Sequence, residues 1–239
     1  MTVLRVVCWL WPPMTDTYRS KFNATHVNTL RNMVERHYSD PHEVVCITNM
    51  PDGIDERVRI VPLWDEFADV YSPHGNNQPA CYRRVRAFSR EMADIIGPRF
   101  VSVDLDCVIV DDMRPLWNRK EDFVIYNYPM RTTPYNGSMW MMNAGARHHV
   151  YEDFKPDVSP IKAKKAGFRG SDQAWFCYAL GPNEATWNYK SGVVAWRSDL
   201  KCRDYKLPEH SRIVFFHGLV DPWDAEARKR APWVEEHYR

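Results

Sequence analysis

The stretch Val101-Ser102-Val103-Asp104-Leu105-Asp106 joins an apolar, β-branched segment to two carboxylates. The apolar segment predicts a buried strand over 99–103, and alternation along an extended chain places Asp104 and Asp106 on one side. Ligands of open α/β sheets bind at the carboxyl ends of strands. Two close carboxylates repel each other unless a cation or a proton lies between them. Because Mg²⁺ and Mn²⁺ prefer oxygen ligands and commonly bridge diphosphates, the stretch predicts a site for one of these ions.

The segments around this stretch predict an α/β fold. Strands and helices alternate up to about residue 106 and strands dominate after it, which is typical of a mostly parallel, mixed sheet flanked by helices. We expect strands at 3–10, 43–48, 58–61, 99–103, 107–110, 123–126, 138–142 and 213–216. We expect helices at 22–38, 81–95 and 171–180, a long loop at 62–79 and a charged helical tail at 224–239. With no linker and no repeat, we expect one domain, 1–239.

Composition excludes several classes of protein. Of the 239 residues, 44% are hydrophobic and 26% are charged, which is ordinary for a globular chain, and the net charge of +1 gives no support for a broad nucleic-acid surface. No apolar run approaches the ~20 residues of a transmembrane helix. The short apolar N-terminus is interrupted by Arg5 and lacks a signal-peptide cleavage site. The six cysteines form no C-x-x-C pair, which predicts reduced thiols and a cytoplasmic location.

Two other kinds of site also use closely spaced aspartates. A calcium-binding EF-hand loop is excluded because the apolar residues 107–110 occupy places that need polar ligands and a glycine. A phosphatase of the haloacid-dehalogenase type stays open, with Asp104 as its nucleophile and Asp106 as its acid or base. That motif normally continues with Gly-Thr, where this chain has Cys107-Val108. The sequence contains no P-loop, dinucleotide fingerprint, nucleophilic serine elbow or histidine cluster of metal-binding spacing.

Five short motifs follow one another along the chain. They are Tyr82-Arg83-Arg84-Val85, the segment from Ser102 to Trp117 that contains both aspartates, Tyr135-Asn136-Gly137-Ser138, Ser171-Asp172-Gln173, and Phe216-His217-Gly218 with Asp221-Pro222-Trp223. In sequence, order and approximate spacing they resemble motifs of glycosyltransferase family 8. The resemblance covers nearly the whole chain, to about residue 223. It implies a GT-A-type, Rossmann-like fold.

The resemblance also implies an activity, namely transfer of a hexose from a nucleotide diphosphate sugar, a uridine-linked one, with retention of the anomeric configuration. Asp104, Asp106 and His217 would hold Mn²⁺ or Mg²⁺, and the ion would stabilise the departing diphosphate. Asp172 and Gln173 would be the catalytic residues, with Gln173 near the anomeric carbon. The implied donor contacts are Trp9, Trp11, Arg84, Asp104, Asn136, Asp172 and Gly218.

Some of these implied roles have a plain structural alternative. Trp9 and Trp11 would stack on the base, but buried tryptophans of a core fit the same sequence. Arg84 could be a solvated helix arginine, and His217 could be a hydrogen-bonded residue at a strand end. The chain has ten tryptophans and only ten glycines. This surplus of aromatic rings fits both uses, packing in the core and stacking on a ligand.

The sequence departs from the family pattern at two places. The family histidine usually lies three residues before the glycine, where this chain has Phe215, whereas His217 directly precedes Gly218. The family lysine before Pro-Trp, which neutralises the diphosphate, is replaced by Asp221. Possible substitute cations are Arg84, Arg131, Lys190 and Arg212. The replacement leaves open a third hypothesis, a sugar- or nucleotide-binding module without turnover.

The acceptor is not predicted by any motif. It could be a glycan, a lipid-linked sugar, a protein or a modified nucleic-acid base. Compact chains of this type without an anchor or a basic tail resemble enzymes of bacteria and their phages.

Overall fold

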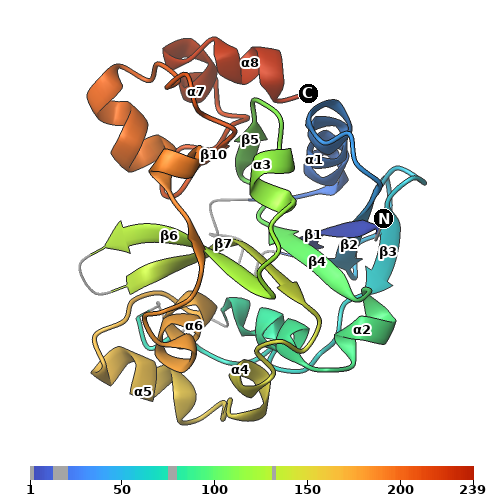
Figure 1. Ribbon diagram of the computed structural model, residues 1–239, viewed down its shortest axis with the longest axis vertical. Helices are drawn as coiled ribbons and strands as arrows, with labels where there is room; N and C mark the ends of the chain where they lie inside the picture. Colours follow the sequence, from blue (N-terminus) through green and yellow to red (C-terminus); the bar gives the residue numbers. More distant parts are fainter. Residues whose placement is uncertain (1–2, 13–20, 75–79, 131–132) are drawn as a thin grey trace.

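The main element of the structure is a seven-stranded sheet, in the order β3-β2-β1-β4-β7-β6-β8 (Figure 1). The computed structural model describes residues 3–12, 21–74, 80–130 and 133–239. The strands are β1 (Leu4–Leu10), β2 (His42–Thr48), β3 (Arg59–Pro62), β4 (Arg99–Val103), β6 (Phe123–Met130), β7 (Thr133–Asn143) and β8 (Thr186–Trp187).

Most neighbouring strands of this sheet are parallel. β3, β2, β1 and β4 pair in parallel, β7 is antiparallel to both β4 and β6, and β8 is parallel to β6. Of the seven residues of β1, only Arg5 is not buried, as expected for a strand covered on both faces. The prediction of a mostly parallel, mixed sheet flanked by helices is confirmed.

A second sheet begins directly after the two aspartates. It has three strands in the order β5-β10-β9, which are β5 (Cys107–Ile109), β9 (Val193–Ala195) and β10 (Ile213–Phe215). The strand β4 ends at Val103, so the extended geometry assumed for Asp104 and Asp106 does not continue, and the two residues form the link between the sheets. The link is fixed on both sides, because Asp104 N donates to Ser138 O at 2.9 Å and Phe216 N donates to Asp106 O at 2.8 Å.

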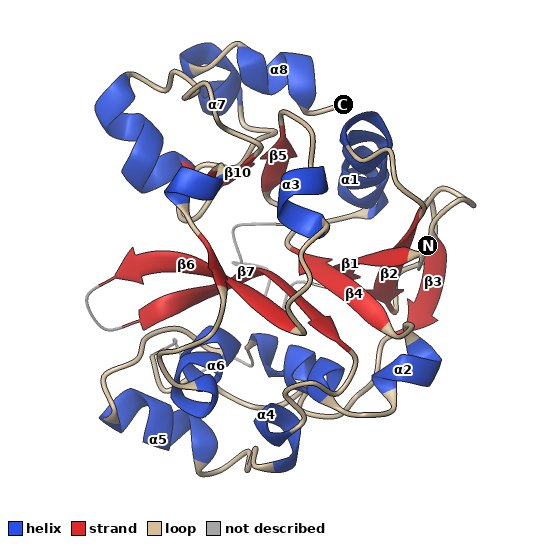
Figure 2. Ribbon diagram, in the orientation of Figure 1, coloured by secondary structure: helices blue, strands red, loops and turns tan. Residues whose placement is uncertain are grey.

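Helices cover both faces of the large sheet (Figure 2). On the side of the small sheet lie α1 (Ala24–His37), α3 (Arg114–Trp117), α7 (Ala225–Arg230) and α8 (Trp233–His237) (Figure 1). On the other side lie α2 (Met92–Ile95), α4 (His149–Glu152), α5 (Ser159–Lys165) and α6 (Asp172–Leu180) (Figure 1). Each side has its own apolar cluster, one around Leu30, Val101 and Val214 and the other around Phe88, Trp140 and Phe176. No described helix is long and apolar enough to cross a bilayer.

The predicted helix over 81–95 is two shorter elements. A 3₁₀ helix, η1, spans Cys81–Phe88, and α2 follows after a break. Tyr82, Val85 and Phe88 are fully buried at a spacing of three, which is the period that a 3₁₀ helix aligns on one face. The break comes at Ser89, whose backbone is extended. The tighter winding has a functional consequence, because it buries Arg84 instead of leaving it in solvent.

Other predicted elements are present with shifted ends. The strands expected at 123–126 and 138–142 lengthen into β6 and β7, and the strand expected at 58–61 is β3. Ser171 occupies the N-cap position of α6, although its side chain makes no capping bond and donates instead to Asp172 Oδ1 at 3.0 Å. The charged tail contains α7 and α8. The short elements α3, α4, α5, β8 and β9 were not predicted.

Seven of the ten tryptophans are buried, and four tryptophans donate their indole N–H to backbone oxygens. Trp9 instead donates to a side chain, because its Nε1 bonds to Ser102 Oγ at 2.9 Å. This bond ties β1 to β4. Trp11 lies edge-on to Trp9, with ring centroids 6.3 Å apart. The four backbone acceptors are the carbonyls of Arg83 for Trp64, Val150 for Trp175, Leu116 for Trp187 and Tyr205 for Trp233. The buried indole nitrogens of Trp117 and Trp140 have no hydrogen-bond partner within the described residues.

We predict that Trp9→Phe destabilises the protein by about 1–3 kcal/mol, because it leaves the fully buried Ser102 hydroxyl without this donor. Trp11→Phe is the matched control, since Trp11 is only half-buried, and we expect a change within about 1 kcal/mol. The measurement is the free energy of unfolding in urea. Equal effects of the two substitutions would show that the Trp9–Ser102 bond contributes nothing specific.

Candidate active site

A cavity of about 360 Å³ opens at the carboxyl end of β4. It lies between the link joining the sheets, the strand β7, the start of α6 and the segment after β10. Seven of the ten predicted site residues line it, namely Arg84, Asp104, Asp106, Asn136, Gln173, His217 and Gly218. The fold therefore gathers residues from five separate parts of the sequence at one point.

Two carboxylates of the cavity lie close enough to interact. The pKa of Asp106 is raised well above its usual range, because the side chain is buried and because Asp104 and Asp221 carry like charges nearby. Asp221 is itself only 2% exposed. The acidic residue at the position of the family lysine therefore adds to the negative charge around Asp106.

Arg84 connects three walls of the cavity. Its Nε donates to Asp172 Oδ2 at 2.6 Å, and its Nη1 donates to Asp104 Oδ1 at 2.6 Å and to Gly137 O at 3.2 Å. Burial lowers the pKa of Arg84, but the charges of Asp172 and Asp104 outweigh it and hold the pKa well above its usual range. The guanidinium is thus a fixed, fully charged part of the site.

The β7 segment is shaped around this guanidinium. A Cβ on Gly137 would lie 2.8 Å from Arg84 Nη2, so a larger residue would displace the arginine. Asn136 Oδ1 accepts from Ser138 N at 2.8 Å, which leaves the Asn136 amide N–H₂ as the group that a ligand hydroxyl would meet. Asn136 and Gly137 therefore hold defined positions at the cavity wall.

The start of α6 contributes an acid and an amide. Asp172 is 2% exposed and is committed to Arg84, so it does not itself line the cavity. Gln173 lines the cavity, and its Nε2 donates to Arg169 O at 3.2 Å. Gly170 has φ +104°, and a Cβ there would lie 2.7 Å from Gln173 Cγ. The glycine lets the glutamine side chain lie flat against the backbone.

His217 is a half-buried, neutral imidazole at the cavity. Burial lowers its pKa to about 4. Its Nε2 lies 3.1 Å from Ser138 Oγ, and its ring stacks on Phe215 at a centroid distance of 5.8 Å. Nδ1 is buried, and within the described residues it has no hydrogen-bond partner.

The side chains at this cavity include ligand types that suit a divalent cation, but these side chains are not assembled around one point. Carboxylates of Asp104 and Asp106 and the neutral imidazole of His217 are types of ligand that Mn²⁺ accepts. A cation would also relieve the repulsion that raises the pKa of Asp106. The described residues nevertheless contain no group of three or more potential ligands placed to hold a metal ion together.

The remaining predicted residues lie elsewhere. Neither Trp9 nor Trp11 is among the described residues that line the cavity, and Trp9 is in the core. Of the suggested substitute cations, Arg212 pairs with Asp111 at 3.5 Å, away from the cavity, and Lys190 does not line it. Arg131 lies outside the described residues.

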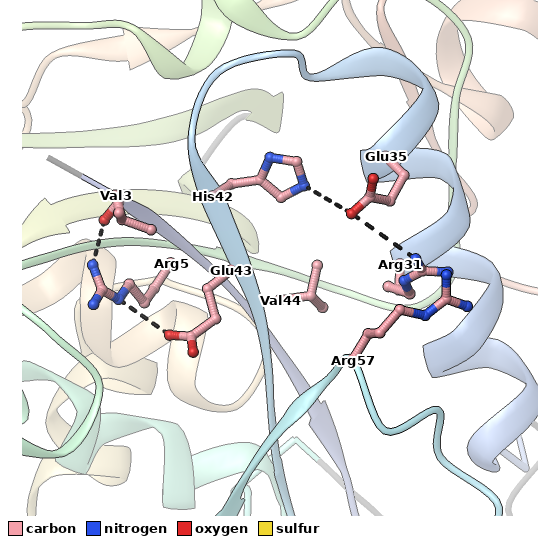
Figure 3. Close-up of a pocket in the computed structure, with 8 residues that line it drawn as sticks. All are labelled: Val3, Arg5, Arg31, Glu35, His42, Glu43, Val44 and Arg57. Atoms are coloured by element: carbon pink, nitrogen blue, oxygen red, sulfur yellow. Dashed lines mark hydrogen bonds and ion pairs between the residues drawn. The ribbon is translucent and has the colours of Figure 1, made fainter. Parts of the chain in front are cut away.

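A second hollow, of about 420 Å³, lies at the opposite, amino edge of β1 and β2 (Figure 3). Figure 3 shows Arg5 turned toward Glu43, and Glu35 between His42 and Arg31. The third arginine of this hollow, Arg57, pairs with Asp55 at 2.6 Å. These arginines are matched by acids of the protein, so this hollow is a network of ion pairs.

Three lining residues of the active-site cavity had no signal in the sequence. They are Tyr128, Thr133 and Arg197. Tyr128 and Thr133 lie in strands, where their types are common. Arg197 follows β9, a short strand that was not predicted, and no motif marks it.

No family model and no curated protein sequence matches the chain. Solved structures do match. A galactosyltransferase, LgtC, in complex with donor and acceptor sugar analogues is 12% identical with a TM-score of 0.61, over 99% of this chain and 97% of that one. The glycosyltransferase GlyE of Streptococcus pneumoniae is 11% identical with a TM-score of 0.59, over 98% of this chain and 60% of that one. Mouse xyloside xylosyltransferase 1 is 13% identical with a TM-score of 0.54, over 90% of this chain and 98% of that one.

At these identities the comparisons establish the fold. The chain has the GT-A fold of glycosyltransferases, as its sequence motifs predicted.

We predict that Arg84→Met destabilises the protein by about 3–5 kcal/mol, because it leaves the buried Asp172 carboxylate without its cation. Arg90→Met is the control, since Arg90 is 66% exposed and its contacts with Glu152 and His148 lie at the surface, and we expect at most about 0.5 kcal/mol. Adding Asp172→Asn to Arg84→Met should restore part of the loss. Urea unfolding measures all four proteins, and equal losses for the two single variants would contradict the role of Arg84.

The lowered pKa of His217 predicts acid sensitivity of the metal-free protein. The unfolded chain binds a proton at the ordinary pKa near 6.5, whereas the folded chain binds it only near pH 4. Folding is therefore weakened progressively as the pH falls from 6.5 to 4, by about 2 kcal/mol at pH 5.

His217→Phe keeps the aromatic stack and removes the titrating group. We expect it to lose less stability than the wild type between pH 7 and pH 5, measured by urea unfolding in EDTA. Identical pH dependence of the two proteins would show that His217 is not the group concerned.

Proposed function

We propose that the protein is a metal-dependent glycosyltransferase that moves a hexose from a nucleotide diphosphate sugar, a uridine-linked one, to an acceptor with retention of configuration. The observation that carries the proposal is the cavity itself. In a GT-A fold, it places Asp104 and Asp106 at the end of a central strand beside Arg84, Asn136 and Gln173. We also propose that residues 1–239 act as one catalytic domain.

The first role of these residues is to bind and orient the donor. Mn²⁺ or Mg²⁺, held by Asp104, Asp106 and His217, would supply Lewis-acid stabilisation of the diphosphate. Asn136 offers its amide to the hydroxyls of the sugar. Arg84 fixes Asp104 and Asp172 in one orientation, and the rigid geometry limits the positions that the donor can take.

The second role is to assist the exchange of bonds at the anomeric carbon. The bond from this carbon to the phosphate oxygen breaks, the bond to the acceptor oxygen forms, and the acceptor proton passes to the departing phosphate. Gln173 lies in the cavity wall next to Asp172 and would place its amide beside the anomeric carbon. In the structural neighbour LgtC, a glutamine replaced by glutamate is described as an active-site mutation.

Two observations favour the transferase over a phosphatase. The chain has a GT-A fold, and the carboxylate that would be the phosphatase nucleophile, Asp104, accepts a hydrogen bond from Arg84. Donation to a carboxylate stabilises its charge and makes it a weaker nucleophile. The buried Asp221 keeps the binding-only module as the second candidate, because it adds negative charge near the diphosphate.

The decisive experiment measures binding of UDP by calorimetry with Mn²⁺ and with EDTA, followed by hydrolysis of UDP-glucose and UDP-galactose in the same sample. We expect Mn²⁺-dependent binding and slow release of UDP from a donor. Asp104→Asn should weaken the Mn²⁺-dependent binding by on the order of 100-fold, because it removes a charged ligand.

Asp111→Asn is the matched control, since Asp111 is an exposed acid that pairs with Arg212 outside the cavity. It should bind UDP as the wild type does. Binding without hydrolysis supports the binding-only module. Unchanged binding by Asp104→Asn would remove Asp104 from the site.

A further inference from the structure

Arg197 is brought to the cavity by the register of the small sheet. β9 and β10 are parallel, and Phe215 pairs with Ala195. Two residues beyond this pair, β10 leads to His217 and β9 leads to Arg197. Because parallel strands end at the same edge, Arg197 comes to lie beside the segment His217-Gly218, and all three residues line the cavity.

The backbone at Arg197 is held firmly, whereas its side chain is exposed. Arg197 is the second residue of a π-helical turn, η3 (Trp196–Leu200), a form that is frequent at functional sites. The preceding Trp196 is 4% exposed and stacks on Phe216 at a centroid distance of 4.6 Å. Asp199 Oδ2 accepts from Ala195 N at 2.8 Å and closes the turn. The side chain therefore starts from a fixed point and extends over the cavity.

Gly218 lies directly beside this side chain. It has φ +112°, which favours glycine, and a Cβ at this position would lie 3.6 Å from Arg197 Cδ and 3.7 Å from Arg197 Nη1. Within the described residues, no carboxylate lies within ion-pair distance of the Arg197 guanidinium. Its charge is thus available to a ligand.

The charge balance of the cavity calls for such a cation. Of the described lining residues, Arg84 and Arg197 are the charged cations, since His217 is neutral. Arg84 is already balanced by Asp104 and Asp172, each at 2.6 Å. Asp106 and Asp221 add two more carboxyl groups close by, and Asp104 and Asp221 help to raise the pKa of Asp106. A diphosphate that enters beside these carboxyl groups, together with the metal ion of the proposed function, would gain a further positive charge from Arg197.

We propose that Arg197 binds the diphosphate of the donor and replaces the cation that is lost where Asp221 stands before Pro222-Trp223. The planar guanidinium can donate two hydrogen bonds to phosphate oxygens. This assignment rests on the proposed function, since it concerns the same cavity and the same class of ligand. It makes Arg197 a binding residue that this chain uses in place of the family lysine.

The test compares UDP with UMP, which share the base and the sugar and differ by one phosphate. Calorimetric titrations with Mn²⁺ give the ratio of the two affinities for each protein. In Arg197→Gln, we expect the preference for UDP over UMP to fall by on the order of tenfold, because one charge-assisted contact is lost. Arg197→Lys keeps the charge and should retain part of the preference.

Arg203→Gln is the matched control, because it removes the same charge from a nearby exposed arginine, which lies over the Tyr189 ring at 5.6 Å. Its ratio should equal that of the wild type. If the ratio of UDP to UMP affinity in Arg197→Gln stays within about threefold of the wild-type ratio, the assignment is overturned. A change that small is less than the loss of one charged contact produces. Failure of the wild-type protein to bind UDP at all would instead reject the proposed function, and this inference with it.

Discussion

The guanidinium of Arg84 is the contact on which the cavity depends. It bonds to the end of β4 at Asp104, to β7 at the Gly137 carbonyl and to the start of α6 at Asp172. A buried arginine is tolerated only when its charge and donors are matched. The three walls must therefore come together for the protein to fold stably.

A second constraint is the crossing of the chain between two sheets at Asp104-Leu105-Asp106. Because β4 and β5 belong to different sheets, the two aspartates lie where the carboxyl end of the large sheet meets the segment after β10. This crossing concentrates acid at one point, with Asp221 close by. In the function that we propose, this concentration of acid would hold the cation that binds the diphosphate.

The strand Arg99–Val103, its two terminal carboxylates and the GT-A fold were predictable, because burial pattern, strand-end position and motif order agree. Arg84 was predicted as a donor contact, yet its partners were not, because a helical stripe over 81–95 hides the 3₁₀ period that buries it. Arg197 could not have been found, since it reaches the cavity only through the pairing of β9 with β10. For Trp9, the sequence left two uses open, and the structure places it in the core.

The most direct test of this account is a crystal structure with UDP and Mn²⁺, with the metal located by its anomalous diffraction. We expect one manganese peak in the cavity, bonded to carboxylate oxygens of Asp104 and Asp106 and to the diphosphate. A manganese peak elsewhere, or UDP bound outside the cavity, would contradict the assignment of this cavity as the donor site.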